Sequence, residues 1–175
     1  MRLLKKSGLP VAAVVLMLAS IGCSRTNSVN YKDSVEKALE QADYKGLSVA
    51  EEVDKNTITL SGKLHSEDAK QKAAEVAKSV AGDRVVANEI SVEPLGVESE
   101  AKSIESNLDD GIESNYKAAL ISKGLDKRSI NFKSKNGVLT LSGKVKTGSE
   151  RQEAGLLATN IPNVAQVLNQ IEVKR

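Results

Sequence analysis

The sequence predicts an α+β fold made of two tandem small αββαβ domains, each a three-stranded mixed sheet with two helices packed on one face. Three observations lead to this expectation. One segment of the chain is repeated, an Asn-Gly pair separates two alternating apolar runs, and apolar residues recur at helical spacing after those runs. Together they predict a first domain over 31–93 and a second domain over 112–175.

The N-terminal residues 1–22 are predicted to be a signal peptide. Basic residues precede an apolar run over 9–21, which is shorter than the roughly 18 apolar residues that span a bilayer. The run ends in Ala-Ser-Ile-Gly before Cys23, the single cysteine of the chain, and this resembles a bacterial lipobox in which Ser20 replaces the usual Leu. We expect Cys23 to be acylated, with 23–30 as a tether. The alternative is an ordinary cleaved signal with an incidental cysteine.

The internal repeat has an offset of 81 residues. Thr-Leu-Ser-Gly-Lys-Leu at 59–64 reappears as Thr-Leu-Ser-Gly-Lys-Val at 140–145, and the register continues without a gap as far as Val92 and Val173. Chance rarely preserves a register over this length. Two long copies indicate a domain duplication rather than a solenoid, which needs three or more short units.

The second copy contains the clearest hairpin. Asn136-Gly137 between two alternating runs favours a two-residue type I′ turn, which places Phe132 opposite Leu141. Ser66 and Thr147 are expected to cap the helix that follows each hairpin.

Each copy also has a leading helix and a final strand. The apolar residues expected to face the cores from the leading helices are Val35, Ala38, Leu39 and Ala42 in the first copy and Ile112, Tyr116, Ala119 and Leu120 in the second. The final strands alternate through Val86, Ile90 and Val92 and through Val167, Ile171 and Val173.

Two stretches depart from the regular pattern. Glu51 stands where the second copy has Phe132, so we expect a bulge or a shifted register around Val53. Between the copies, 94–111 is predicted to be an acidic linker with a helix that Asp109-Asp110-Gly111 interrupts.

Catalytic and metal sites have little support in the sequence. His65 is the single histidine and its repeat equivalent is Lys146, so a Ser-His-acid triad has no support. His65, Glu67 and Asp68 could form part of a metal site, but no second cluster completes the coordination sphere. Three Tyr, one Phe and no Trp leave few surfaces for base stacking. We therefore expect no enzyme activity, no metal or other cofactor, and no nucleic-acid partner.

The repeated pattern resembles the BON domain, named for osmotically inducible protein Y and nodulation proteins. The matching features are Leu-Ser-Gly after the second strand, with Gly62 and Gly143, and a Val-x-Asn-x-Ile-x-Val strand with Asn88 and Asn169. A lipobox followed by two such domains is similar to the dual-BON outer-membrane lipoproteins of the DolP type. The resemblance implies a periplasmic envelope-integrity protein whose second domain binds anionic phospholipid. In those relatives an aromatic residue of the leading helix enters the membrane, where this chain has Ile112 and Tyr116.

Charge is distributed unevenly along the chain. Residues 31–93 carry nine Lys/Arg against thirteen Asp/Glu, residues 94–114 carry one against six, and residues 115–175 carry eleven against four. The hairpin register places Lys133, Lys135 and Lys144 on the face opposite the core. Basic side chains near an anionic bilayer contribute about 1 kcal/mol each. The predicted phospholipid-binding residues are Lys127, Arg128, Lys133, Lys135, Lys144, Lys146 and Arg151.

These observations predict a non-enzymatic protein of the periplasm, anchored by its N-terminal lipid to the inner leaflet of the outer membrane and binding anionic phospholipid head groups. Ser24 after the cysteine is compatible with outer-membrane sorting by the rule known for enterobacteria. One alternative is that the basic face is a solvated surface that only balances the charge of the acidic first domain and linker, with docking on them as one way to do so. Others are a protein-binding adaptor or chaperone-like factor with an acidic partner, and a structural role in the cell wall or a pore.

Overall fold

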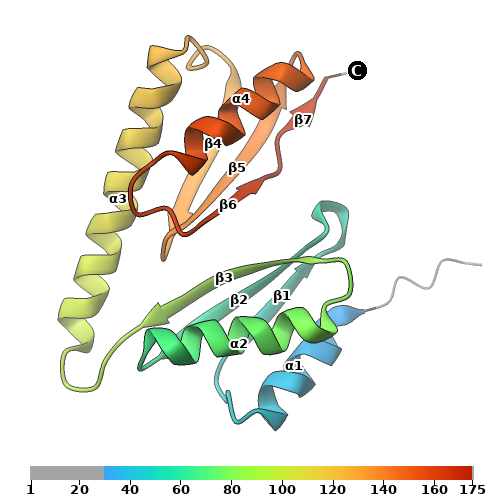
Figure 1. Ribbon diagram of the computed structural model, residues 1–175, viewed down its shortest axis with the longest axis vertical. Coiled ribbons are helices and arrows are strands. Elements are labelled where there is room, and N and C mark those ends of the chain that lie inside the picture. Colours follow the sequence, from blue (N-terminus) through green and yellow to red (C-terminus); the bar gives the residue numbers. More distant parts are fainter. Residues whose placement is uncertain (1–29, 175) are drawn as a thin grey trace, which may run out of the picture.

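The computed structural model describes residues 30–174 and shows two tandem α+β domains (Figure 1). In domain 1 two helices cover one face of a sheet with strand order β1-β2-β3. Strand β1 pairs antiparallel with β2, and β2 pairs parallel with β3, as the predicted mixed sheet requires. The elements of domain 1 are α1 (Tyr31–Gln41), β1 (Ser48–Glu52), a 3-10 helix (Val53–Lys55), β2 (Thr57–Leu64), α2 (Glu67–Val80) and β3 (Val85–Val92).

Domain 2 repeats this plan with strand order β4-β5-β6, and its predicted last strand is divided into β6 and β7, which both pair parallel with β5. The division falls at Gln170 and Ile171, where the side-chain oxygen of Asn169 accepts a hydrogen bond from Ile171 N (3.3 Å). The elements are α3 (Glu98–Ser122), β4 (Ser129–Lys135), β5 (Val138–Val145), α4 (Gly148–Thr159), β6 (Gln166–Asn169) and β7 (Glu172–Val173).

The repeated asparagine of the last strand ties the sheet of each domain to a helix. The Asn88 amide donates to the Lys70 carbonyl oxygen (3.0 Å), and the Asn169 amide donates to the Arg151 carbonyl oxygen (2.9 Å). Lys70 and Arg151 are themselves repeat equivalents, 81 residues apart. The same contact in both copies explains why an asparagine recurs at this position.

The two hairpins differ, as the sequence indicated. In domain 2, Asn136 and Gly137 both have positive φ (49° and 81°), as a type I′ turn requires, and Phe132 lies opposite Leu141. In domain 1 the longer connection places Val49, rather than Glu51, opposite Leu60. This shifted register confirms the expectation around Val53. Because the shift is two residues, the alternation of inward and outward side chains is preserved.

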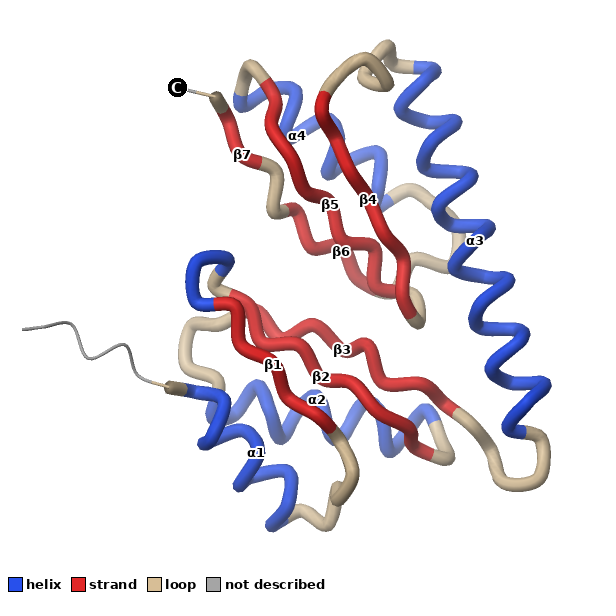
Figure 2. Tube along the Cα trace, turned by 180° about the vertical axis from the view of Figure 1, so that it is seen from behind, coloured by secondary structure: helices blue, strands red, loops and turns tan. Residues whose placement is uncertain are grey.

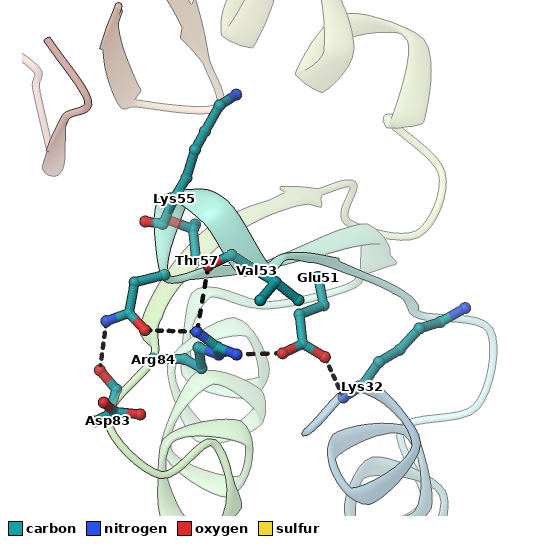
Figure 3. Close-up of polar contacts among 8 residues, drawn as sticks. Lys32, Glu51, Val53, Lys55, Thr57, Asp83 and Arg84 are labelled. Atoms are coloured by element: carbon teal, nitrogen blue, oxygen red, sulfur yellow. Dashed lines mark hydrogen bonds and ion pairs between the residues drawn. The ribbon is translucent and has the colours of Figure 1, made fainter. Parts of the chain in front are cut away.

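Glu51 keeps the inward orientation of its repeat equivalent Phe132, and a polar network surrounds it (Figure 3). Arg84 Nε donates to Glu51 Oε1 (3.1 Å), and the backbone N–H of Lys32 at the start of α1 donates to Glu51 Oε2 (3.2 Å). The Arg84 and Glu51 side chains are only 12% and 7% exposed. Arg84 also donates to Asn56 Oδ1 (2.7 Å) and lies 5.6 Å from the ring centroid of Tyr31. The network therefore joins α1, the hairpin and β3.

Helix α3 is continuous from Glu98 to Ser122, so the predicted interruption at Asp109-Asp110-Gly111 was wrong. A tertiary contact holds this part of the helix. The Asp109 carboxylate accepts hydrogen bonds from Asn136 N (2.7 Å) and Gly137 N (3.1 Å) in the hairpin turn. It also accepts one from the Ser134 hydroxyl (2.6 Å). An acidic side chain that binds a turn in this way favours the helix despite its low local propensity.

The two domains pack against each other through the hairpin turn and β6 of domain 2, which face β3 of domain 1 (Figure 2). Ala87, Val138 and Leu168 form a small buried cluster between the domains. The Asn136 amide donates to the Glu89 carbonyl oxygen (2.7 Å), and Lys135 forms an ion pair with the Glu89 side chain (2.9 Å). A basic domain is thus docked on an acidic one.

Candidate functional site

The lysines predicted on the outer face of the domain 2 sheet lie there, and each pairs with a carboxylate. Lys133 binds Glu113 of α3 (2.9 Å), and Lys144 binds Glu172 of β7 (3.0 Å). Lys135 binds Glu89 of domain 1, as described above. The docking alternative therefore describes Lys135, whose partner Glu89 belongs to domain 1, whereas Lys133 pairs with Glu113 of α3 within domain 2. A role of these three lysines in phospholipid binding stays a prediction.

Three of the four remaining predicted cations, Lys127, Arg128 and Lys146, lie at the end of domain 2 that points away from domain 1, which we call the far end (Figure 1). Ser129 pairs with Lys144, so the residues before β4 and those after β5 meet there. Lys174 joins them, because its N–H donates to the Val145 carbonyl oxygen (2.8 Å). The cations of the far end are Lys123, Lys127, Arg128, Lys146 and Lys174. The predicted residue Arg151 lies apart from them, with its guanidinium 3.4 Å from the Asn169 carbonyl oxygen.

Four of these five cations, all except Arg128, are exposed and form no ion pair within residues 30–174. The sequence analysis did not predict Lys123 and Lys174, because both are far from the hairpin in the chain although the fold brings them to the same end of the domain. The signal available for Lys123 was its position before Gly124, whose positive φ (66°) ends α3.

Arg128 has a structural contact. Its Nε donates to Glu150 Oε1 (2.7 Å), while Glu150 Oε2 accepts from the backbone N–H groups of Lys146 and Thr147 (2.8 and 3.2 Å). Thr147 completes the capping box of α4, as its predicted cap role requires. The Arg128 guanidinium and then these N–H groups lower the pKa of Glu150 below its ordinary value. Arg128 thereby fixes the geometry of the β5–α4 junction at the far end.

The same end of domain 2 also carries an exposed apolar side chain. Ile121, near the end of α3, is 55% exposed, and it lines a cavity of about 390 Å³ together with residues of α3 and β4. The cavity residues are Lys117, Leu120, Ile121, Leu125, Asp126, Ile130 and Phe132.

The residues that the resemblance suggested for membrane insertion are not available for it. Ile112 and Tyr116 are 1% and 0% exposed. Tyr116 packs edge-on against Phe132 (centroids 5.1 Å apart), and its hydroxyl donates to the Ala154 carbonyl oxygen (3.1 Å). Their spacing on α3 marks the core face of the helix, and Ile121 lies outside this face.

Two further sites considered from the sequence are a metal site at His65 and the acylation site at Cys23. His65 Nδ1 lies 2.9 Å from the Glu93 carbonyl oxygen, a contact between the end of β2 and the end of β3. Within residues 30–174 no three His, Cys, Asp or Glu side chains are grouped to hold a metal ion. Cys23 and the signal peptide lie outside the described residues.

The fold and its match to a protein family identify the class of this chain. The class that the structure defines is a pair of duplicated α+β domains, each built of a mixed sheet and two helices. Residues 29–94 and 108–175 both match the family model of the BON domain, and the chain therefore belongs to the BON-domain family. Proteins of this family bind membranes or phospholipids in general, and the family is generally non-enzymatic.

The searches of curated proteins and of solved structures give no further information on function. A comparison with curated proteins found no match. The C-terminal domain of CdsD, the structural protein of the type III secretion system of Chlamydia trachomatis, is similar at 14% identity with a TM-score of 0.32. The match covers 82% of this chain and 64% of that chain. Within the described part of this chain, none of the helices has the length and apolar character that crossing a membrane requires.

Proposed function

We propose that this protein is a lipoprotein of the DolP type, acylated at Cys23, that binds anionic phospholipid through the far end of domain 2. It resides in the periplasm at the inner leaflet of the outer membrane and supports envelope integrity and stress tolerance. The observation that carries the proposal is an exposed isoleucine, Ile121, on the end of the domain that also carries unpaired lysines. The general membrane association of the family and the lipobox-like N-terminus support it.

The far end has the two components of a peripheral membrane contact. Each lysine within a Debye length of an anionic surface contributes about 1 kcal/mol, so Lys123, Lys127 and Lys146 together supply about 3 kcal/mol at low salt. Burial of an isoleucine side chain in the acyl boundary adds about 1.5–3 kcal/mol. Neither component alone gives firm binding, and together with an acyl anchor they do.

The far end fits this role better than the outer face of the domain 2 sheet. Lys133, Lys135 and Lys144 already have carboxylate partners at 2.9–3.0 Å, so a phosphate must compete with them. Domain 1, with its excess of acidic residues, lies beside that face and repels an anionic surface. The far end points away from domain 1 along the long axis of the molecule (Figure 1).

The test is co-sedimentation of the chain from Ser24 onward with phosphatidylglycerol/cardiolipin vesicles and with zwitterionic vesicles, across a salt series. We expect selective binding to anionic vesicles that weakens with salt. Charge reversal of Lys123, Lys127 and Lys146 to Glu should abolish binding, and Ile121→Ser should weaken it about tenfold, as loss of roughly 1.4 kcal/mol predicts.

The matched control reverses three exposed lysines outside the far end, Lys37, Lys78 and Lys102, which also form no ion pair within the described residues. It changes the net charge equally and should retain most of the binding. Equal losses in both triple variants would show a response to net charge alone and would overturn the assignment to the far end. Absence of binding to either vesicle at low salt would overturn the lipid proposal itself.

A further inference from the structure

The outer edge of the domain 1 sheet is covered by domain 2. The Gln166 amide donates to the Val86 carbonyl oxygen (2.9 Å), and its oxygen accepts from Asn88 N (3.4 Å). Further along β3, Glu105 of α3 accepts from Val92 N (2.8 Å). An exposed edge strand presents unpaired N–H and C=O groups that can pair with another chain. The contacts from domain 2 and α3 remove this possibility for β3.

The equivalent edge of domain 2 is open. Gln170 and Lys174 donate their N–H groups to Leu141 and Val145 of β5, so Asn169, Ile171 and Val173 direct their backbone groups away from the sheet. Ile171 N and the Asn169 carbonyl oxygen have side-chain partners, at 3.3 and 3.4 Å. Within residues 30–174, the N–H groups of Asn169 and Val173 and the carbonyl oxygens of Ile171 and Val173 have none.

A cleft of about 960 Å³ lies in front of this edge, with the loop of domain 1 that holds the 3-10 helix on its other side. Figure 2 shows that loop and β7 on the same side of the molecule. The charged residues that line the cleft are Lys55, Lys144, Arg151 and Lys174 against Asp54 and Glu172. Lys55 and Lys144 pair with Glu52 and Glu172 (both 3.0 Å), so Arg151 and Lys174 are the cleft cations that form no ion pair within residues 30–174. A chain that enters the cleft thus meets unpaired strand groups on one wall and these two cations beside them.

We propose that the β6–β7 edge binds an extended acidic segment of a partner protein by strand addition. Backbone groups of Asn169, Ile171 and Val173 supply the affinity common to this mode of recognition, and the cleft cations select carboxylate side chains. The cleft shares Lys174 with the far end, but the unpaired strand groups and the cation Arg151 lie outside the far end, so this inference does not depend on the phospholipid proposal.

Neither this chain nor a second copy fits the edge as well. The acidic segment around 98–113 is already part of helix α3. A second copy would have to dock its acidic domain 1 on the β6–β7 edge. In the contact that covers β3, the side-chain amide of Gln166 pairs with the strand edge, but the equivalent residue of domain 1 is Val85, which has no amide. A partner with a free, extended acidic segment meets both requirements of the cleft.

The test uses a peptide of alternating Thr and Glu, added to the chain from Ser24 onward, which contains both domains whole. We expect salt-sensitive binding and slower hydrogen exchange at the amides of Asn169 and Val173. Val173→Pro removes one outward donor without touching a ladder bond, since Lys174 N rather than Val173 N donates to β5. It should weaken binding about tenfold, as loss of a hydrogen bond does, while Val173→Ala should leave binding intact.

Charge and backbone contributions are separated by two further measurements. Lys174→Glu should weaken binding of the Glu peptide, and a Thr-Lys peptide should not bind. A Glu peptide with N-methylated backbone should also fail. Equal binding of the methylated peptide, or binding without protection at Asn169 and Val173, would overturn strand addition. Protection of the same amides by anionic vesicles would assign the cleft to phospholipid instead. The far-end triple variant should bind the peptide normally, so the two proposals fail independently.

Discussion

The two domains share one plan but differ in how their edges and ends are used. In domain 1 the outer strand of the sheet is covered by Gln166 and α3, and a buried ion pair between Glu51 and Arg84 closes the end near α1. In domain 2 the outer strand is open, and the far end carries both unpaired lysines and the exposed Ile121. Duplication thus produced one domain that is enclosed and one that presents surfaces.

This difference between the two domains indicates which positions of a duplicated fold bind partners. The positions that are repeated, such as Asn88 and Asn169, maintain the common architecture. The positions that are not repeated, such as Gln166 against Val85, determine which domain is covered and which is free. Binding residues are therefore expected among the differences between the copies.

The largest effect is expected at the repeated glycine after the second strand. A Cβ on Gly143 would overlap the Ser129 carbonyl oxygen, and its φ of 106° suits glycine alone. Gly143→Ala should destabilise the protein by about 3 kcal/mol, the sum of backbone strain and overpacking.

The comparison with domain 1 makes this prediction sharper. At Gly62 the nearest atom to an added Cβ is the flexible end of Leu47 at 3.0 Å, so Gly62→Ala should lower the free energy of unfolding less, by about 1–2 kcal/mol. Urea unfolding of both variants, followed by circular dichroism, measures the difference. Equal losses would mean that the two copies tolerate a side chain alike and would contradict the geometry.

The next largest difference is expected between two polar side chains that face inward from the first strand of each hairpin. Glu51 in domain 1 and Ser134 in domain 2 occupy equivalent places in the two hairpins. Glu51→Gln leaves Arg84 without its carboxylate and should lower the free energy of unfolding by about 2–3 kcal/mol. Ser134→Ala loses one hydrogen bond to Asp109 and should lower it by about 1 kcal/mol. Thermal unfolding of the two variants compares them, and a larger loss in Ser134→Ala would refute this ranking.

Much of the fold was predictable because its signals are local. The Asn136-Gly137 pair fixes its hairpin register through two residues with positive φ, and Ser66 and Thr147 cap their helices as expected. Glu51 in place of the Phe of the second copy was enough to predict either a bulge or a shifted register, and the structure has the shifted register. These features depend on residues close together in the chain.

The features that sequence reasoning missed depend on distant partners. The continuity of α3 through Gly111 relies on Asp109 binding the hairpin turn, which is 27 residues away. Lys133 and Lys135 were placed on the correct face, but their carboxylate partners belong to other elements. The position of Ile121 outside the core face of α3 follows from the helical spacing of Ile112, Tyr116 and Leu120, but its place at the end of domain 2 that carries the unpaired lysines depends on the tertiary fold.

A smaller effect is expected at the interface that encloses β3. Gln166→Ala loses two hydrogen bonds to the edge and should reduce stability by about 1–2 kcal/mol. Gln152→Ala, at an exposed position of α4, is the control and should change stability by less than about 0.5 kcal/mol. Hydrogen exchange should accelerate at Asn88 in the first variant alone. Unchanged exchange there would show that Gln166 does not protect the edge.

The smallest effect concerns acid. Burial tends to raise the pKa of Glu113, but the Ser134 N–H and Lys133 outweigh it, and the pKa lies below its ordinary value. A lowered pKa stabilises the folded state above the unfolded value of about 4.3, and this contribution disappears as pH falls through the folded value. The stability advantage of the parent over Glu113→Gln should therefore shrink on acidification. Urea midpoints at pH values on both sides of that window test this, and an advantage that grows in acid would contradict it.

In the proposed function, domain 2 meets the membrane through its far end while domain 1 does not. Amide-resolved NMR of the chain from Ser24 onward, with anionic bicelles that contain a paramagnetic lipid, tests it most directly. We expect line broadening around Ile121, Lys123 to Arg128 and Lys146, with α1 and α2 unaffected. Broadening centred on domain 1, or on the outer face of the domain 2 sheet at Lys133 and Lys135, would contradict it.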